Sequence, residues 1–264
     1  MRALILLIIL NPGLVATAQR VELGTFIGLS NYTGDVAPKG MILSETKWAA
    51  GFLARYNFNN TWAFTASATQ LRIGGSDKNV PFNQSRNITF RTDITEFSGV
   101  FEFNYFRYGT GVLDNHFTPY VYWGLGAAIF NPQGQYKNEW YDLRDYRTEG
   151  KSYGSVTMIM PMGIGLKWMP SKNMSVEWLL GLRKTYTDYL DDVSTVYPDL
   201  AEKLATQGEI SAALSDPSML LNEGVPLNKP AYQRGNPDYK DWYYTTQVTL
   251  TYRIFSRIKC SRFY

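Results

Sequence analysis

The sequence predicts an all-β fold, an eight-stranded antiparallel transmembrane β-barrel with long extracellular loops and short periplasmic turns. Eight stretches place apolar or aromatic residues at every second position. This is the side-chain period of a strand whose two faces meet different surroundings. A cleavable export signal precedes these stretches, and a single cysteine excludes an internal disulfide. Together these features are typical of a bacterial outer-membrane barrel.

The N-terminus has the order of a secretory signal peptide. Arg2 precedes the apolar run 3–10, and Ala16-Thr17-Ala18 offers a cleavage site before Gln19. We therefore expect residues 1–18 to be removed and residues 19–264 to form a single barrel domain that ends in a short periplasmic tail, residues 256–264. No later apolar run approaches the roughly 20 residues of a spanning helix.

The alternation assigns each predicted strand a lipid-facing and an inward face. In the fifth, Val121, Trp123 and Leu125 alternate with Tyr122 and Gly124. The third stretch is the least regular, so its faces are not assigned. The predicted strands lie near residues 21–30, 47–58, 62–73, 96–105, 117–129, 156–168, 176–185 and 244–253.

A water-soluble barrel of the lipocalin kind would also alternate, but with its apolar face turned inward around a ligand. Here one face combines glycines with Glu and Arg, and the other is continuously apolar, which favours lipid contact. The connections after the second, fourth and sixth strands look short and the others long. This asymmetry favours an outer-membrane barrel.

An eight-stranded barrel is only wide enough for side chains to fill it. Antiparallel order brings five inward charges to a similar depth near the periplasmic end, with Glu22 beside both Arg55 and Arg253. We expect a charge-paired plug, since isolated charges there would be costly; the alternative is that the charges contact trapped water. The cluster consists of Glu22, Arg55, Lys167, Glu177 and Arg253.

No catalytic, cofactor, metal or nucleic-acid motif stands out. His116 is the only histidine, and strand order places it in a short turn, which favours a solvated side chain over a catalytic one. Asp188, Asp191 and Asp192 could present carboxylates to calcium, but the EF-hand spacing and its Gly are absent. We expect these acids to cap the loop.

The connection from 187 to 241 is unusually long for a compact barrel. Its segment 198–205 predicts a short helix, with Pro198 at the start and Gly208 near the end. A lid over the extracellular mouth and a docking surface are both open interpretations.

The C-terminal tail combines basic residues with the single cysteine. Arg257, Lys259 and Arg262 would attract an acidic partner or lipid head groups, and Cys260 suggests an intermolecular disulfide in an oxidising compartment. The alternative is a frayed terminus that serves only as an assembly signal.

Three loop segments resemble the PorG family of type IX secretion. They are Asn31-Tyr32-Thr33-Gly34-Asp35, residues 187–194, and Arg234-Gly235-Asn236-Pro237 with Asp241-Trp242-Tyr243; the opening Glu22-Leu23-Gly24 and the basic end with Lys259-Cys260 agree. The resemblance implies a non-enzymatic outer-membrane barrel that tethers a periplasmic ring of PorK-like and PorN-like proteins in secretion and gliding. That the tail contacts the ring is our inference from topology.

Two functions therefore compete. One is a structural subunit, integral to the outer membrane with both termini in the periplasm, that anchors such a ring. The other is a free-standing barrel that acts through its extracellular loops as an adhesin or small-solute porin.

Overall fold

The structure, a computed structural model, describes residues 21–38, 40, 42–109 and 114–254. The predicted signal peptide and the tail residues Arg257, Lys259, Cys260 and Arg262 lie outside the described residues. Among the described residues, none of the helices is long and apolar enough to cross a membrane.

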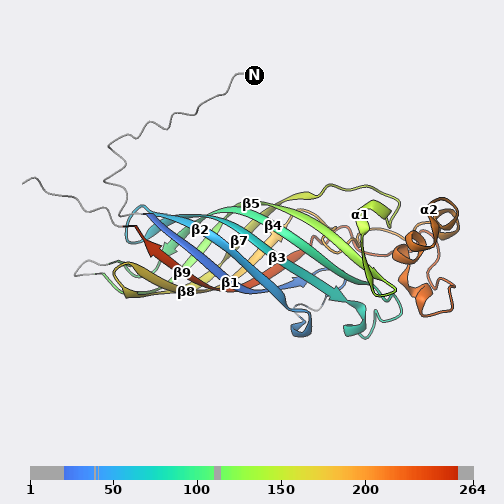
Figure 1. Ribbon diagram of the computed structural model, residues 1–264, viewed down its shortest axis with the longest axis horizontal. Helices are drawn as coiled ribbons and strands as arrows, with labels where there is room; N and C mark the ends of the chain where they lie inside the picture. The colour runs from blue at the N-terminus through green and yellow to red at the C-terminus, as the bar shows by residue number, and fades with distance from the viewer. Residues whose placement is uncertain (1–20, 39, 41, 110–113, 255–264) are drawn as a thin grey trace, which may run out of the picture.

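Eight long strands form a closed antiparallel barrel (Figure 1). The sheet closes because the first strand pairs with both the second and the last. A short strand, β6 (Glu139–Asp142), adds a hairpin to one edge of β5. The predicted eight-stranded barrel is confirmed. The eight strands are β1 (Val21–Thr33), β2 (Lys47–Asn57), β3 (Trp62–Ser76), β4 (Thr89–Asn104), β5 (Phe117–Tyr136), β7 (Val156–Ser171), β8 (Met174–Thr185) and β9 (Trp242–Arg253).

The barrel has a turn end, where β1 begins and β9 stops, and a loop end, where α1 and α2 lie (Figure 1). At the turn end, residues 58–61 and 172–173 make the expected short connections. The third connection at this end, residues 105–116, is longer than the short turn predicted from the sequence. The loop end carries residues 34–46, 77–88, 137–155 and 186–241.

The outer wall is an apolar belt. Large apolar side chains of every long strand are exposed, and Ile27 and Phe52 reach 71%. A water-soluble protein rarely exposes a continuous apolar surface of this extent. A closed barrel with such a belt spans a membrane, which excludes the lipocalin-like alternative.

The interior has two layers. Charged and polar side chains fill it toward the turn end, whereas an apolar core fills it toward the loop end. Tyr32, Phe90, Phe130 and Tyr243 are the largest side chains of that core. The strands around the core are longer than the roughly 9–11 residues that cross a bilayer. For example, β5 has 20 residues, so the barrel continues past the membrane as a small apolar-cored domain.

Within the residues that the structure describes, the loops at this end carry two α-helices and three short 3-10 helices. The α-helices are α1 (Leu143–Tyr146) and α2 (Leu200–Ser215). The second begins after Asp199, whose carboxylate accepts hydrogen bonds from the backbone amides of Ala201 and Glu202. The predicted helix is present, but Gly208 does not end it. Gly208 kinks the chain at φ 81°, and the helix continues to Ser215. The 3-10 helices are η3 (Leu43–Glu45), η4 (Asp77–Asn79) and η5 (Pro217–Leu220).

Candidate functional site

The inward charges near the turn end form a network around Arg55. The strand register places Glu22 beside both Arg55 and Arg253. Arg55 Nη1 lies 3.1 Å from Glu22 Oε2, and Arg55 Nη2 lies 2.7 Å from Glu177 Oε2. Arg253 Nη2 donates to Glu22 Oε1 at 2.6 Å. A guanidinium with five N–H donors can serve several carboxylates at once.

Glu102 of β4 completes this network, and the sequence prediction omitted it. Its Oε2 lies 3.0 Å from Arg55 Nε and also accepts from Lys167 Nζ. Lys167 in turn lies 4.3 Å from the centroid of the Tyr120 ring. The turn-end network thus balances three carboxylates against three cations: Glu22, Glu102 and Glu177 with Arg55, Lys167 and Arg253.

A second buried pair lies deeper in the barrel. Arg183 Nε is 3.3 Å from Glu96 Oε2, and the Tyr243 hydroxyl donates to the same oxygen at 2.8 Å. The cavity between this pair and the turn-end network has a volume of only about 50 Å³. Side chains, not an open channel, fill this level.

At the loop end, the Tyr32 hydroxyl lies between two buried carboxylates. It is 2.6 Å from Asp191 Oδ2 and 2.7 Å from Asp241 Oδ1. A tyrosine hydroxyl has one hydrogen, so it can donate to only one of them. The second contact requires a proton on a carboxylate. This geometry stores a proton in the folded loop end, whose long loops (residues 34–46, 77–88, 137–155 and 186–241) we call the lid.

An arginine pair ties the surrounding loops together. Arg234 Nη1 lies 3.1 Å from Glu149 Oε1 and donates to the Asp192 carbonyl. Arg86 donates to Asp77, to the Arg234 carbonyl at 2.9 Å and to the Asp35 carbonyl at 3.0 Å. We call the whole group the lid cluster: Tyr32, Asp35, Asp77, Arg86, Glu149, Asp188, Asp191, Asp192, Arg234 and Asp241.

Burial raises the pKa of several lid carboxyls. It raises the pKa of Asp188 to about 7 and, against the charge of Arg234, that of Asp192 to about 6. Burial and the charge of Asp241 raise the pKa of Asp191 well above its ordinary range. Burial, with the charge of Asp188, does the same for the pKa of Asp241. Low-dielectric surroundings disfavour the charged form of each carboxyl.

The three acids considered for calcium point to different partners. Asp191 binds Tyr32, Asp192 accepts from Thr148 and Tyr153, and Asp188, which is 3% exposed, lies beside Ser194. Within the described ranges, no three His, Cys, Asp or Glu side chains are arranged to hold a metal ion. Asp191 and Asp192 therefore hold the loops together, which agrees with the capping role expected for them.

His116 lies at the turn end, where it is exposed. Its backbone carbonyl accepts a hydrogen bond from the Met169 amide at 2.7 Å. This position agrees with the solvated turn histidine expected from the sequence.

The three loop segments that carry the PorG resemblance meet in the lid cluster. Tyr32 contacts Asp191 and Asp241, and the Asn236 amide donates to Asp35 Oδ2 at 2.8 Å. Segments separated by as many as 209 residues therefore form one site. Sequence spacing could not reveal this, since only the closed barrel brings β1, β8 and β9 side by side.

A family model described as a domain of unknown function, DUF6089, matches residues 1–206. No curated protein sequence matches the chain.

Solved structures with a similar fold are outer-membrane proteins. They include neisserial surface protein A, with 7% identity, a TM-score of 0.43 and coverage of 88% of this chain and 96% of that one. The attachment invasion locus protein Ail of Yersinia pestis, in complex with a heparin analogue, has 14% identity, a TM-score of 0.41 and coverage of 88% and 98%. A major outer membrane protein from Thermus thermophilus has 9% identity, a TM-score of 0.41 and coverage of 88% and 98%. Identities this low carry no information about function.

Proposed function

The chain belongs to the DUF6089 family, and we propose that it is a non-enzymatic outer-membrane anchor that holds a periplasmic protein ring. In this proposal the turn end, with both termini, faces the periplasm and the loop end faces outward. The partners are ring proteins of a type IX secretion and gliding machinery, of the PorK-like and PorN-like kind.

The observation that carries the proposal is the turn-end network. Arg55 is 2% exposed and is neutralised by three carboxylates within the barrel. Breaking one member of a buried charge set leaves uncompensated charge, so a closed network resists opening. A barrel filled in this way is poorly suited to passing solutes. Its function then belongs to the surfaces at its ends.

The sequence resemblance supports the same reading. The three loop segments that resemble the PorG family help to close the lid cluster. These segments therefore have a structural role at the loop end. The turn end is then the surface that we assign to the partner. The tail with Arg257, Lys259, Cys260 and Arg262 is our candidate contact, with a disulfide through Cys260.

The test is a pull-down of the barrel from membranes in mild detergent, on non-reducing gels with mass spectrometry of each band. Wild type is compared with Cys260→Ser, with a variant lacking residues 256–264, and with a loop-end control carrying Leu221→Ser and Val225→Ser. The anchor predicts a periplasmic lipoprotein ring that wild type and the control retain and the truncated form loses. A wild-type barrel recovered alone would contradict the proposal.

A second candidate, an adhesin that acts through the loops, is favoured by one observation. The tip of the lid exposes four apolar side chains, each at least 45% accessible: Leu220, Leu221, Val225 and Leu227. Exposed apolar clusters outside a membrane often mark protein contacts. In the same experiment this candidate predicts a bound partner that is lost from the loop-end control and kept by the tail variants.

A further inference from the structure

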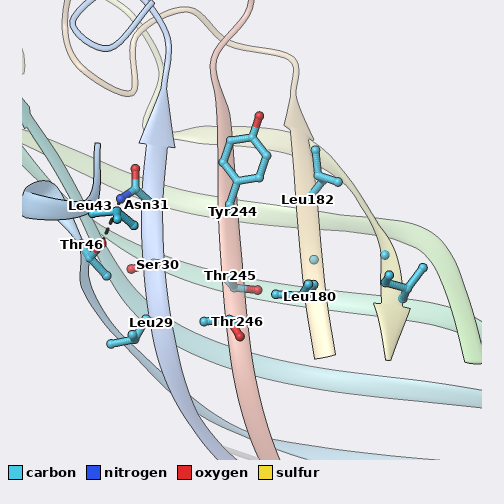
Figure 2. A pocket seen from close by; sticks show the side chains of 13 residues that line it. Leu29, Ser30, Asn31, Leu43, Thr46, Leu180, Leu182, Tyr244, Thr245 and Thr246 are labelled. Carbon is cyan, nitrogen blue, oxygen red and sulfur yellow. Dashed lines mark hydrogen bonds between the residues drawn. The ribbon is translucent and has the colours of Figure 1, made fainter. Parts of the chain in front are cut away.

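A groove lies on the outside of the barrel near the loop end (Figure 2). Its volume is about 500 Å³, which is within the usual range for a site that holds one small ligand. Its walls are almost entirely apolar. The side chains that shape it are Leu29, Leu43, Ile164, Leu180, Leu182 and Thr246.

Two features shape this groove in the outer wall. Leu29, Thr246, Leu180 and Ile164 form one row across β1, β9, β8 and β7, and the small Thr246 makes the floor. The loop after β1 folds back along the wall and brings Leu43 to the groove (Figure 2).

Hydrogen bonds hold that loop in place. Asn31 Nδ2 donates to the Ile42 carbonyl at 2.9 Å and to Thr46 Oγ1 at 3.1 Å. Because Leu43 lies between these two anchored residues, it is fixed at the groove although 83% of its surface is exposed. The groove is therefore built before any ligand arrives.

A lysine lies at the loop-end lip. Lys184 follows Leu182 by two residues on the same outward face, about 7 Å along the strand. Its Nζ is 6.0 Å from the centroid of the Tyr186 ring and 5.9 Å from that of Trp242. Among the described residues it forms no ion pair. Tyrosine and tryptophan at this position are typical of a membrane interface.

We propose that the groove binds one acyl chain of an anionic membrane lipid, whose phosphate lies against Lys184. The occupant follows from the position, because an apolar groove on the lipid-facing belt meets acyl chains. The lysine then provides the charge that a phosphate head group needs. This site goes beyond the proposed anchor function, and it holds for either orientation of the barrel.

The test is native mass spectrometry of the detergent-purified, folded barrel titrated with phosphatidylglycerol or phosphatidylcholine. Wild type is compared with Lys184→Gln and with Thr246→Trp, which fills the floor from the lipid side. The matched controls are Lys172→Gln, an exposed lysine at the turn end, and Ala127→Trp, a small outward residue of β5. Heat-dependent gel mobility verifies that every variant is folded.

Wild type and both controls should retain one phosphatidylglycerol and release phosphatidylcholine more readily. Lys184→Gln should lower the affinity for phosphatidylglycerol about fivefold, the usual effect of one lysine near an anionic lipid surface, and Thr246→Trp should abolish the single adduct. Equal retention by all variants, or of both lipids by wild type, would show only the lipid that surrounds any barrel and would overturn the proposal.

Discussion

At the scale of single residues, the inward charges were largely predictable, but Glu102 was left out of their network. Strand parity alone placed Glu22, Arg55, Lys167, Glu177 and Arg253 inside the barrel. Glu102 also has inward parity, but it lies on β4, two strands from Arg55, and parity does not predict contacts between strands that are not neighbours. The small residues of β3, Ala63 and Thr65, let the arginine reach across that strand, and Thr65 Oγ1 accepts from Arg55 Nε at 3.1 Å. Strand parity predicts which face a side chain is on, but it does not predict that Arg55 extends across β3.

Removing the hub should destabilise the barrel strongly. Arg55→Ala leaves three buried carboxylates without their shared cation, and we expect a loss of about 3–5 kcal/mol in the free energy of unfolding. Arg72→Ala is the control, because its pair with Asp93 is partly exposed and should contribute only about 0–1 kcal/mol. Urea unfolding from lipid vesicles, followed by tryptophan fluorescence, measures both. Equal losses would show that the network does not stabilise the barrel.

The lid cluster should be sensitive to any side chain added at Gly34. A Cβ there would lie 1.9 Å from Tyr32 Oη and 2.2 Å from Asp241 Oδ1. Gly34→Ala should therefore separate the two hydrogen-bonded partners and loosen the lid while the barrel stays folded. Gly154→Ala, where a Cβ meets nothing within 4 Å, is the control. Protease cleavage in residues 186–241 should rise several-fold in the first variant only; unchanged cleavage would contradict the role given to Tyr32.

At the scale of elements, β3 explains why its faces could not be assigned. Toward the turn end, Trp62 and Phe64 point outward to lipid. Toward the loop end, Leu71 and Ile73 point inward to the apolar core, and Arg72 pairs with Asp93 outside. The apolar face changes sides where the strand leaves the membrane. Periodicity assumes a single environment along a strand, so it could not assign both halves.

The lid as an element should be more stable in mild acid. The pKa values of Asp188 and Asp192 are raised to about 7 and about 6, so between about pH 4 and pH 7 the folded lid holds more protons than the unfolded lid. Its stability is then greatest at the acid end of that window and falls as pH rises through the folded pKa values. The raised pKa values of Asp191 and Asp241 act in the same direction.

Hydrogen exchange of residues 187–195, corrected for the intrinsic effect of pH, measures this dependence. Protection factors should be several-fold higher at pH 5.5 than at pH 8. Asp241→Asn should reduce the difference, since an amide cannot release the stored proton. Asp238→Asn, an exposed neighbour, should leave it unchanged. Protection that rises with pH would contradict the protonated lid.

At the scale of the whole molecule, the barrel is closed at two levels by different physical means. Charge pairing fills the lumen near the turn end, and an apolar core under the lid cluster fills it at the loop end. The alternation predicted the barrel and the charged filling near the turn end, because both follow from strand parity. The filling at the loop end depends on loops such as 137–155 and 186–241. Their contacts arise only when the barrel closes, so they leave no periodic signal in the sequence.

Single-channel recording in a planar bilayer tests the closed lumen most directly. The purified wild-type barrel and a variant lacking the lid tip, residues 218–228, are compared with a general porin inserted in the same membranes. Both barrels should insert without conductance steps, since the turn-end network remains in each. Regular, long-lived steps from the wild type would contradict the closed lumen and with it the anchor that we propose.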